Sequence, residues 1–146
     1  MIISIQELQQ TELYPEVIDA ISRSSEDAVT LQIMAAESFC KSYLFKYDLD
    51  AAFGTADTPP TVESPMLKKM VKTIAAYYLL RMANPNVNLE LYQGEYEAVV
   101  QLLQDVRDGN NNITELPYKT DDPSTPEIEG ELSTSWSSNP KRKNHF

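Results

Sequence analysis

The stretch SPMLKKMVKTIAAYYLLRMANP, residues 64–85, predicts one of the three long helices of the chain. Ser64 is a favourable N-cap residue, and Pro65 suits the first helical position, where its missing N–H would have no intrahelical partner. Pro85 marks the end of the helix, since proline does not continue one. Between these signals the helix stripe recurs at helical spacing, at Leu67, Met70, Val71, Ile74, Tyr77, Tyr78 and Arg81 or Met82.

Two further long helices are predicted, one on either side of this stretch. The first starts near Ser24 or Ser25 and runs to about Tyr47. The second spans Asn88 to Asp108, or begins only after Gly94, because a helical glycine costs about 1 kcal/mol relative to alanine. Both carry an apolar face with steps of three and four, at Val29, Ile33, Ala36, Cys40, Tyr43 and Tyr47 and at Leu89, Tyr92, Tyr96, Val99, Leu103 and Val106.

Shorter elements are predicted before and between the long helices. Ser4 and Glu7 form a capping box, in which each side chain accepts a hydrogen bond from the other residue's backbone N–H. Pro15 begins a second short helix over residues 16–22. Residues 48–61 contain one glycine and two adjacent prolines, which predict a loop. Together these patterns predict a mainly α fold: a small bundle of three longer helices with short N-terminal helices, over residues 1–113.

The composition changes after this domain. Residues 114–146 are rich in Ser, Thr and acidic residues and contain four prolines, at 117, 123, 126 and 140. Such a stretch does not form a regular packed helix, so we expect an extended tail that serves for docking. Residues 132–136, LSTSW, alternate weakly and could form a strand if a partner supplied the other edge.

The charge and the termini restrict the class of protein. The formal net charge is −10, which disfavours nonspecific binding to DNA, RNA or anionic lipid. No stretch approaches the roughly 20 apolar residues of a membrane span. The N-terminus lacks the basic and apolar regions of a signal peptide, and the single cysteine excludes an intramolecular disulfide. We therefore expect a soluble protein of the reducing cytoplasm.

Residues for catalysis or metal binding are scarce. The one histidine, His145, is the penultimate residue, where no neighbour holds it in a fixed geometry. Cys40 lies on an apolar helical stripe and is expected to be a buried small side chain. One Cys and one His do not make a zinc site, and glycine-rich nucleotide loops are absent. The sequence thus predicts no enzyme, no metal, no cofactor and no small-molecule substrate.

Two groups of residues are candidates for binding a protein partner. In the tail, aromatic anchors accompany a basic run, which fits a segment that becomes ordered on a partner: Trp136, Lys141, Arg142, Lys143 and Phe146. The alternative is an unstructured terminus with two stray aromatic residues. In the central helix, Lys68, Lys69 and Lys72 lie away from the apolar stripe. They form either a solvated face or a contact for an acidic partner surface or for the protein's own tail.

Four segments resemble the head–tail joining proteins of Mu-like phages and prophages. AAESFCKSYLFKYDL (35–49) resembles a family helix that ends in a "YL..RYDL"-type phrase. PMLK to YLLR (65–81) and YEAVVQLL (96–103), with Gly109 beyond it, resemble two further helical segments of the family. The ending SSNPKRKNHF (137–146) is similar to the family's serine-, basic- and aromatic-containing terminus.

This resemblance implies a structural connector at the neck of the virion. Its partners would be the portal, the next tail-proximal neck protein and further copies of itself in a ring, with DNA only as passing cargo and no membrane. It would occupy the host bacterial cytoplasm during assembly and the virion neck afterwards. The alternative is a free acidic regulatory module that inhibits a basic partner, which would need its acids concentrated on one face at phosphate-like spacing.

Overall fold

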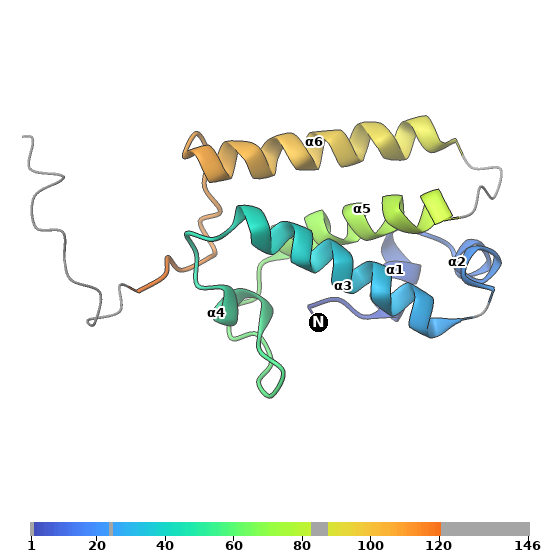
Figure 1. Cartoon of the computed structure of the whole chain (residues 1–146), viewed down its shortest axis with the longest axis horizontal. Coiled ribbons are helices and arrows are strands. Elements are labelled where there is room, and N and C mark those ends of the chain that lie inside the picture. The colour runs from blue at the N-terminus through green and yellow to red at the C-terminus, as the bar shows by residue number, and fades with distance from the viewer. Residues whose placement is uncertain (1, 24, 83–87, 121–146) are drawn as a thin grey trace, which may run out of the picture.

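The computed structural model describes residues 2–23, 25–82 and 88–120, which form six α-helices and no β-strand (Figure 1). The fold class predicted from the sequence, mainly α with three longer helices and short N-terminal ones, is confirmed. The helices are α1 (Ile5–Thr11), α2 (Pro15–Ser22), α3 (Glu26–Tyr43), α4 (Leu49–Phe53), α5 (Pro65–Met82) and α6 (Leu89–Asp108).

Helix α5 is the centre of the bundle. It packs against α2, α3 and α6, and in Figure 1 it lies between α3 and α6. A helix covered on several sides is apolar around most of its circumference, and the buried residues of α5 accordingly include more than one stripe: Leu67, Met70, Val71, Thr73, Ile74, Ala75, Ala76, Leu79 and Leu80.

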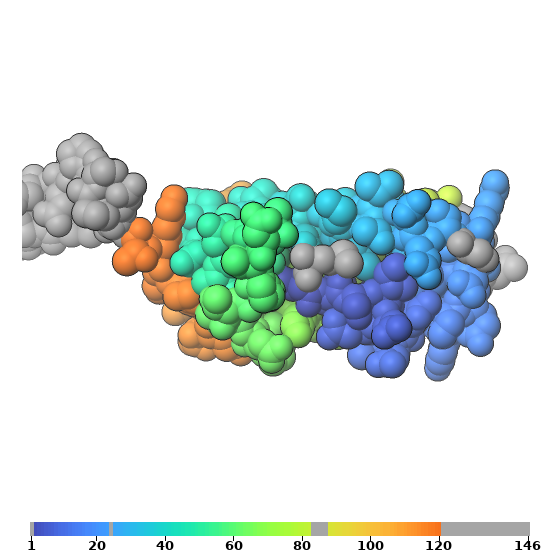
Figure 2. Space-filling view, turned by 90° about the horizontal axis from the view of Figure 1, so that it is seen from below, coloured from blue at the N-terminus to red at the C-terminus, as the bar shows by residue number. Residues whose placement is uncertain are grey.

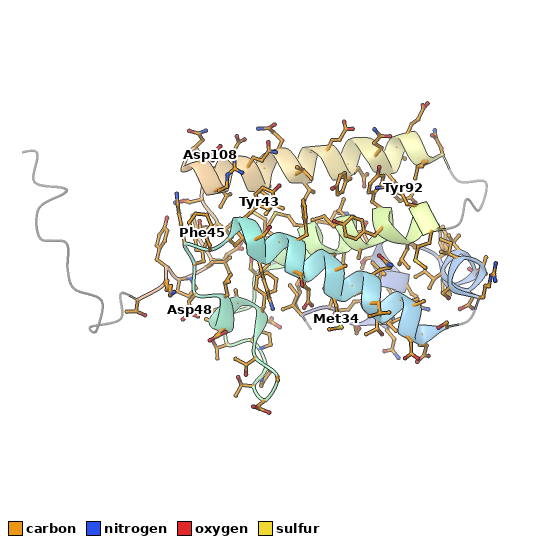
Figure 3. The ribbon with its side chains drawn as sticks, viewed as in Figure 1. Met34, Tyr43, Phe45, Asp48, Tyr92 and Asp108 are labelled. Atoms are coloured by element: carbon orange, nitrogen blue, oxygen red, sulfur yellow. The ribbon has the colours of Figure 1, made fainter. Side chains whose placement is uncertain are left out.

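Helices α3 and α6 pack on α5 through the predicted stripes. In α3, Val29, Ile33, Ala36 and Cys40 are buried. In α6 the burial is uneven, because only Leu103 and Val106 are buried, whereas Tyr92, Tyr96 and Val99 pack partly exposed against the core. Tyr92 points from α6 towards α5 in Figure 3. The first half of α6 therefore leaves more of its surface open than α3 or α5 does.

The helix starts follow the signals in the sequence. The Ser4 Oγ accepts from the Glu7 N–H at 3.1 Å, and a Glu7 carboxylate oxygen accepts from the Ser4 N–H at 3.0 Å, so the capping box is confirmed. The Ser64 Oγ accepts from the Leu67 N–H at 3.2 Å, and Pro65 is the first residue of α5. The predicted stop at residues 84–85 lies outside the described residues.

Two predictions about the chain between α3 and α5 were wrong. Helix α3 ends at Tyr43 and does not run to Tyr47, because the Leu44 N–H bonds the carbonyl oxygens of both Cys40 and Lys41 and the chain then turns away. The segment predicted as a loop contains α4, whose N-cap Asp48 accepts from the Ala51 N–H at 3.0 Å. A turn at Gly54 ends it.

The possible late start of α6 was also wrong, because α6 begins at Leu89 with Asn88 as its N-cap. Gly94 is therefore helical, and a Cβ built on it would meet no atom within 4 Å. We expect Gly94→Ala to raise the free energy of unfolding by about 0.4–1 kcal/mol, because alanine restricts the unfolded chain and fits the helix. Chemical denaturation checks this, and a destabilised variant would contradict the helical start at Leu89.

The segment that follows α6 packs back onto the body. Ile113 and Leu116 are buried, and the Tyr47 side chain and the Lys46 and Asp48 backbone bond this segment. The packed part of the chain thus extends beyond residue 113, where the tail was predicted to begin. Residues 121–146, the rest of that predicted tail, lie outside the described residues.

Candidate functional site

The corner where the described chain ends is built around two stacked tyrosines. The rings of Tyr47 and Tyr118 lie 5.0 Å apart at 15°. The two residues form an isolated antiparallel bridge, flanked by hydrogen bonds from the Asp48 N–H to the Pro117 carbonyl (2.9 Å) and from the Lys119 N–H to the Lys46 carbonyl (3.0 Å). We call residues 46–48 and 117–119 the tyrosine bridge.

Tyr47 fixes this corner to the core. Its side chain is buried, and its hydroxyl accepts from the backbone N–H of Ile113 at 3.0 Å. Burial raises the pKa of Tyr47 above its usual value, which keeps the hydroxyl neutral. The bond joins residues that are 66 positions apart, so neither partner could be read from local sequence.

Two aromatic rings at this corner are exposed, one in the tyrosine bridge and one next to it in the sequence. Tyr118 is 61% exposed and Phe45 is 56% exposed. A pocket of about 240 Å³ beside them is lined by residues that include Phe45, Tyr47, Leu49 and Lys119. Figure 3 shows Phe45 and Asp48 at this end of the molecule, close to where the described chain stops. The corner combines apolar rings with open backbone, which is a chemistry suited to a peptide rather than to a small metabolite.

A second group of aromatic side chains joins the three long helices. The Tyr77 and Tyr96 rings stack at 4.4 Å, and Phe39 lies 5.1 Å from Tyr43 and 6.4 Å from Tyr96. These rings are partly buried against the core. The apolar stripes predicted from the sequence include Tyr43, Tyr77 and Tyr96, which agrees with this placement.

Tyr78 in this cluster gives a prediction about pH. Burial, with the neighbouring Tyr96 as the next cause, raises the pKa of Tyr78 from 10.0 to about 12. The folded protein then keeps a proton that the unfolded chain loses, so this stabilisation is complete below pH 10 and is lost as pH rises towards 12. Tyr78→Phe should make the fall of stability with alkaline pH less steep in denaturation curves. An unchanged slope would contradict this environment.

The three lysines of α5 that the sequence singled out face α1 and the segment before α5. The Lys69 Nζ lies 2.6 Å from a Glu12 carboxylate oxygen, and the Lys72 Nζ donates to the Thr11 Oγ1 at 3.1 Å. The Lys68 Nζ lies 3.5 Å from Glu63. All three therefore have partners within the chain, and the bonds of Lys69 and Lys72 join α5 to the C-terminal end of α1.

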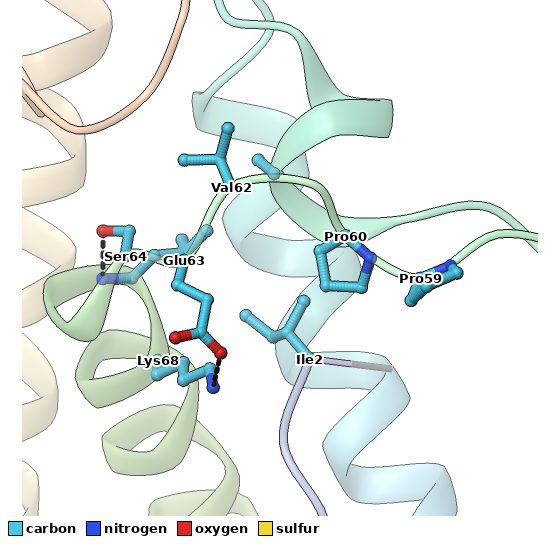
Figure 4. A pocket seen from close by; sticks show the side chains of 9 residues that line it. Ile2, Pro59, Pro60, Val62, Glu63, Ser64 and Lys68 are labelled. Carbon is cyan, nitrogen blue, oxygen red and sulfur yellow. Dashed lines mark hydrogen bonds and ion pairs between the residues drawn. The ribbon is translucent and has the colours of Figure 1, made fainter.

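The pocket in Figure 4 lies where the N-terminal segment meets the start of α5. It measures about 200 Å³, and its wall includes Ile2, Pro60, Val62 and Lys68. That volume is below the roughly 300–1,000 Å³ of typical small-molecule sites. The Lys68–Glu63 ion pair, drawn as a dashed line, already uses the charged groups of its rim. We assign it no ligand.

The described residues contain no group of three or more His, Cys, Asp or Glu side chains able to hold a metal ion. Cys40 is buried, as expected, and burial raises the pKa of its thiol to about 12, so it is not a thiolate at neutral pH. No helix in this part of the chain is long and apolar enough to cross a membrane. Outside the described residues lie the candidates for partner binding in the tail, namely Trp136, Lys141, Arg142, Lys143 and Phe146.

Exposed apolar side chains on two helices were not singled out by the sequence analysis. On α3, Leu31 and Met34 are 63% and 52% exposed, and on α6 Leu91 is 63% exposed. Figure 3 places Met34 on the side of α3 away from α6. The sequence could have indicated their exposure, because none of the three residues belongs to the apolar stripe of its helix. We call Leu31 with Met34 the α3 patch, and Leu91 with the exposed Ala98 the α6 patch.

The fold and these surfaces define a small all-α protein that presents apolar side chains on separate faces. The family described as "Bacteriophage Mu, Gp36" matches residues 3–131, which is most of the chain, and the chain therefore belongs to this family of phage proteins. The residues from 132 onwards lie outside the match. No curated protein and no solved structure is significantly similar to the chain.

Proposed function

We propose that this protein is a structural head–tail connector of a phage or prophage, which assembles as a ring between the portal and the tail. Membership of the phage Mu Gp36 family supports a role in a phage particle or its assembly. The observation that carries the ring is the separation of the α3 patch from the α6 patch. A closed ring of identical subunits uses a heterologous interface, in which two different surfaces of the subunit meet.

The chemistry of the two patches suits such an interface. Exposed Leu and Met side chains on a folded protein frequently mark protein contacts when they gather on one face. The net charge of −10 disfavours retention of the DNA that would pass through the ring as cargo. The location proposed with this function is the host bacterial cytoplasm during assembly and the virion neck afterwards.

The tail is proposed to dock on the portal through Trp136, Lys141–Lys143 and Phe146. Deletion of residues 130–146 should leave the helical circular-dichroism signal intact and abolish binding to the portal. Unimpaired binding by the truncated protein would remove this role from the tail while leaving the proposed ring untouched.

The acidic regulatory module is less well supported. A mimic of DNA charge needs a continuous acidic face, whereas Glu12 and Glu63 are paired with lysines of α5. Asp108 is likewise bound by Arg107 at 2.8 Å. Competition with DNA for a basic partner would favour the module over the connector.

A pair of variants tests the ring interface. Leu31→Arg and Leu91→Arg each place a charge on one patch, and Gln10→Arg on exposed α1 is the matched control. With portal present, the wild type and the control should form rings visible by electron microscopy, and each patch variant should not. When the two patch variants are mixed, they should form a heterodimer by native mass spectrometry, because one intact patch remains on each. Rings formed by either patch variant would contradict the proposed interface.

A further inference from the structure

The backbone of Tyr118 has an open edge. It lies between the two hydrogen bonds of the tyrosine bridge, at Pro117 and Lys119. In an antiparallel pair, a residue between two such bonds directs its own N–H and C=O to the opposite side. The N–H and C=O of Tyr118 therefore point away from residues 46–48, and no described residue bonds them. An edge of this kind accepts a further strand.

The side chains beside this edge are apolar and only partly covered. Phe45 and Lys119 line the pocket of about 240 Å³ together with Tyr47, and the exposed ring of Tyr118 stacks on the Tyr47 ring. An aromatic side chain from an added strand would pack against these rings, since aromatic side chains in contact favour stacked or tilted arrangements. A strand with a large aromatic residue opposite Tyr118 would suit this corner.

One segment of the chain fits this requirement. Residues 132–136, LSTSW, place Leu132, Thr134 and Trp136 on one side and two serines on the other. If Trp136 lies opposite Tyr118 in an antiparallel pair, Thr134 lies opposite Thr120, the last described residue. The sequence that connects the two includes Pro123, Pro126 and Gly130, which are residues typical of loops.

We propose that residues 132–136 of the same chain add to the Tyr118 edge as an antiparallel strand and that Trp136 packs on Tyr118 and Phe45. The same chain is favoured over a second copy because a short linker holds the segment at an effective concentration on the order of millimolar. The inference concerns the free chain, from whose edge Trp136 would be released when the tail docks on the portal, and it does not depend on the connector function.

Trp136 is the only tryptophan, so its fluorescence reports on this site alone. At concentrations where the full chain is monomeric, acrylamide should quench Trp136 about two-fold less than in a free peptide of residues 130–146, because two rings shield the indole. Tyr118→Ala should restore the quenching of the peptide. Tyr14→Ala should not, because Tyr14 is exposed and directly precedes α2, which lies near the opposite end of the molecule (Figures 1 and 2).

Hydrogen exchange tests the backbone bond independently. The Tyr118 amide should exchange about ten-fold or more slowly in the wild type than in Trp136→Ala, because a paired amide exchanges only when the strand opens. The proposal would be overturned if acrylamide quenched Trp136 in the full chain as strongly as in the peptide, or if Trp136 stayed shielded from acrylamide in Tyr118→Ala. It would also be overturned if slow exchange of the Tyr118 amide appeared only as the protein concentration rose, which would assign the strand to a second copy. None of these measurements involves the portal or the ring, so they leave the proposed function untouched.

Discussion

Phe53→Ala should lower the free energy of unfolding by about 3–5 kcal/mol, the range for deletion of a buried aromatic ring. Phe53 is 1% exposed although it belongs to α4, a helix of five residues. The Lys41 Nζ lies 4.9 Å from the centre of its ring, so the ring also anchors α4 to α3. Chemical denaturation followed by circular dichroism gives the change.

Tyr14→Ala is the matched control for this variant. Tyr14 lies just before α2 and is mostly exposed, so its removal should change the stability by no more than about 0.5 kcal/mol. If both variants lost the same small amount, α4 would not be part of the core, and the packing of the segment between α3 and α5 would be wrong.

Tyr47→Ala should also lower the free energy of unfolding by about 3–5 kcal/mol, because it removes a buried ring and leaves a cavity under the tyrosine bridge. It also removes the hydroxyl that accepts from the Ile113 N–H. Tyr47→Phe separates the two effects. It keeps the ring and leaves the buried N–H without its acceptor, which costs about 1–3 kcal/mol.

Tyr14→Phe is the control for the loss of a hydroxyl, because Tyr14 is exposed and should tolerate the change with almost no effect. The measurement is the midpoint of urea unfolding in the three tyrosine variants. Equal stabilities of Tyr47→Phe and the wild type would show that the bond to Ile113 does not hold the segment after α6 to the body.

Local signals explain why most helices could be predicted. The capping box at Ser4, the prolines at 15 and 65, and Asn88 act within one turn of the helix that they start. Gly109 ends α6 with a φ of +83°, a conformation that glycine adopts without strain. Each of these residues acts on its immediate neighbours, so sequence alone is sufficient to interpret it.

The errors have a common physical cause in long-range contacts. The stripe of α3 continues to Tyr47 in the sequence, but Tyr47 is buried by the segment after α6 rather than by helix packing. The helix can therefore end at Tyr43 without exposing Tyr47. Helix α4 is too short to show a periodic pattern, and its burial depends on Phe53 reaching the core.

The candidate site shows the same division. The lysines of α5 were found because they lie off the apolar stripe, but Lys69 and Lys72 bond Glu12 and Thr11, which are 57 and 61 residues away in sequence. The α3 patch and the open edge of Tyr118 depend on which residues the fold leaves uncovered, and this is known only once the helices are packed. The family resemblance covered about residues 25–146. The match to residues 3–131 begins earlier and leaves out the ending 137–146.

The proposed connector function is tested most directly by electron microscopy of the purified chain mixed with the portal from the same phage or prophage. The proposal predicts an additional ring of this protein, bound coaxially at one end of the portal. A portal that is unchanged in the images, with this chain still monomeric at saturating concentration, would contradict it.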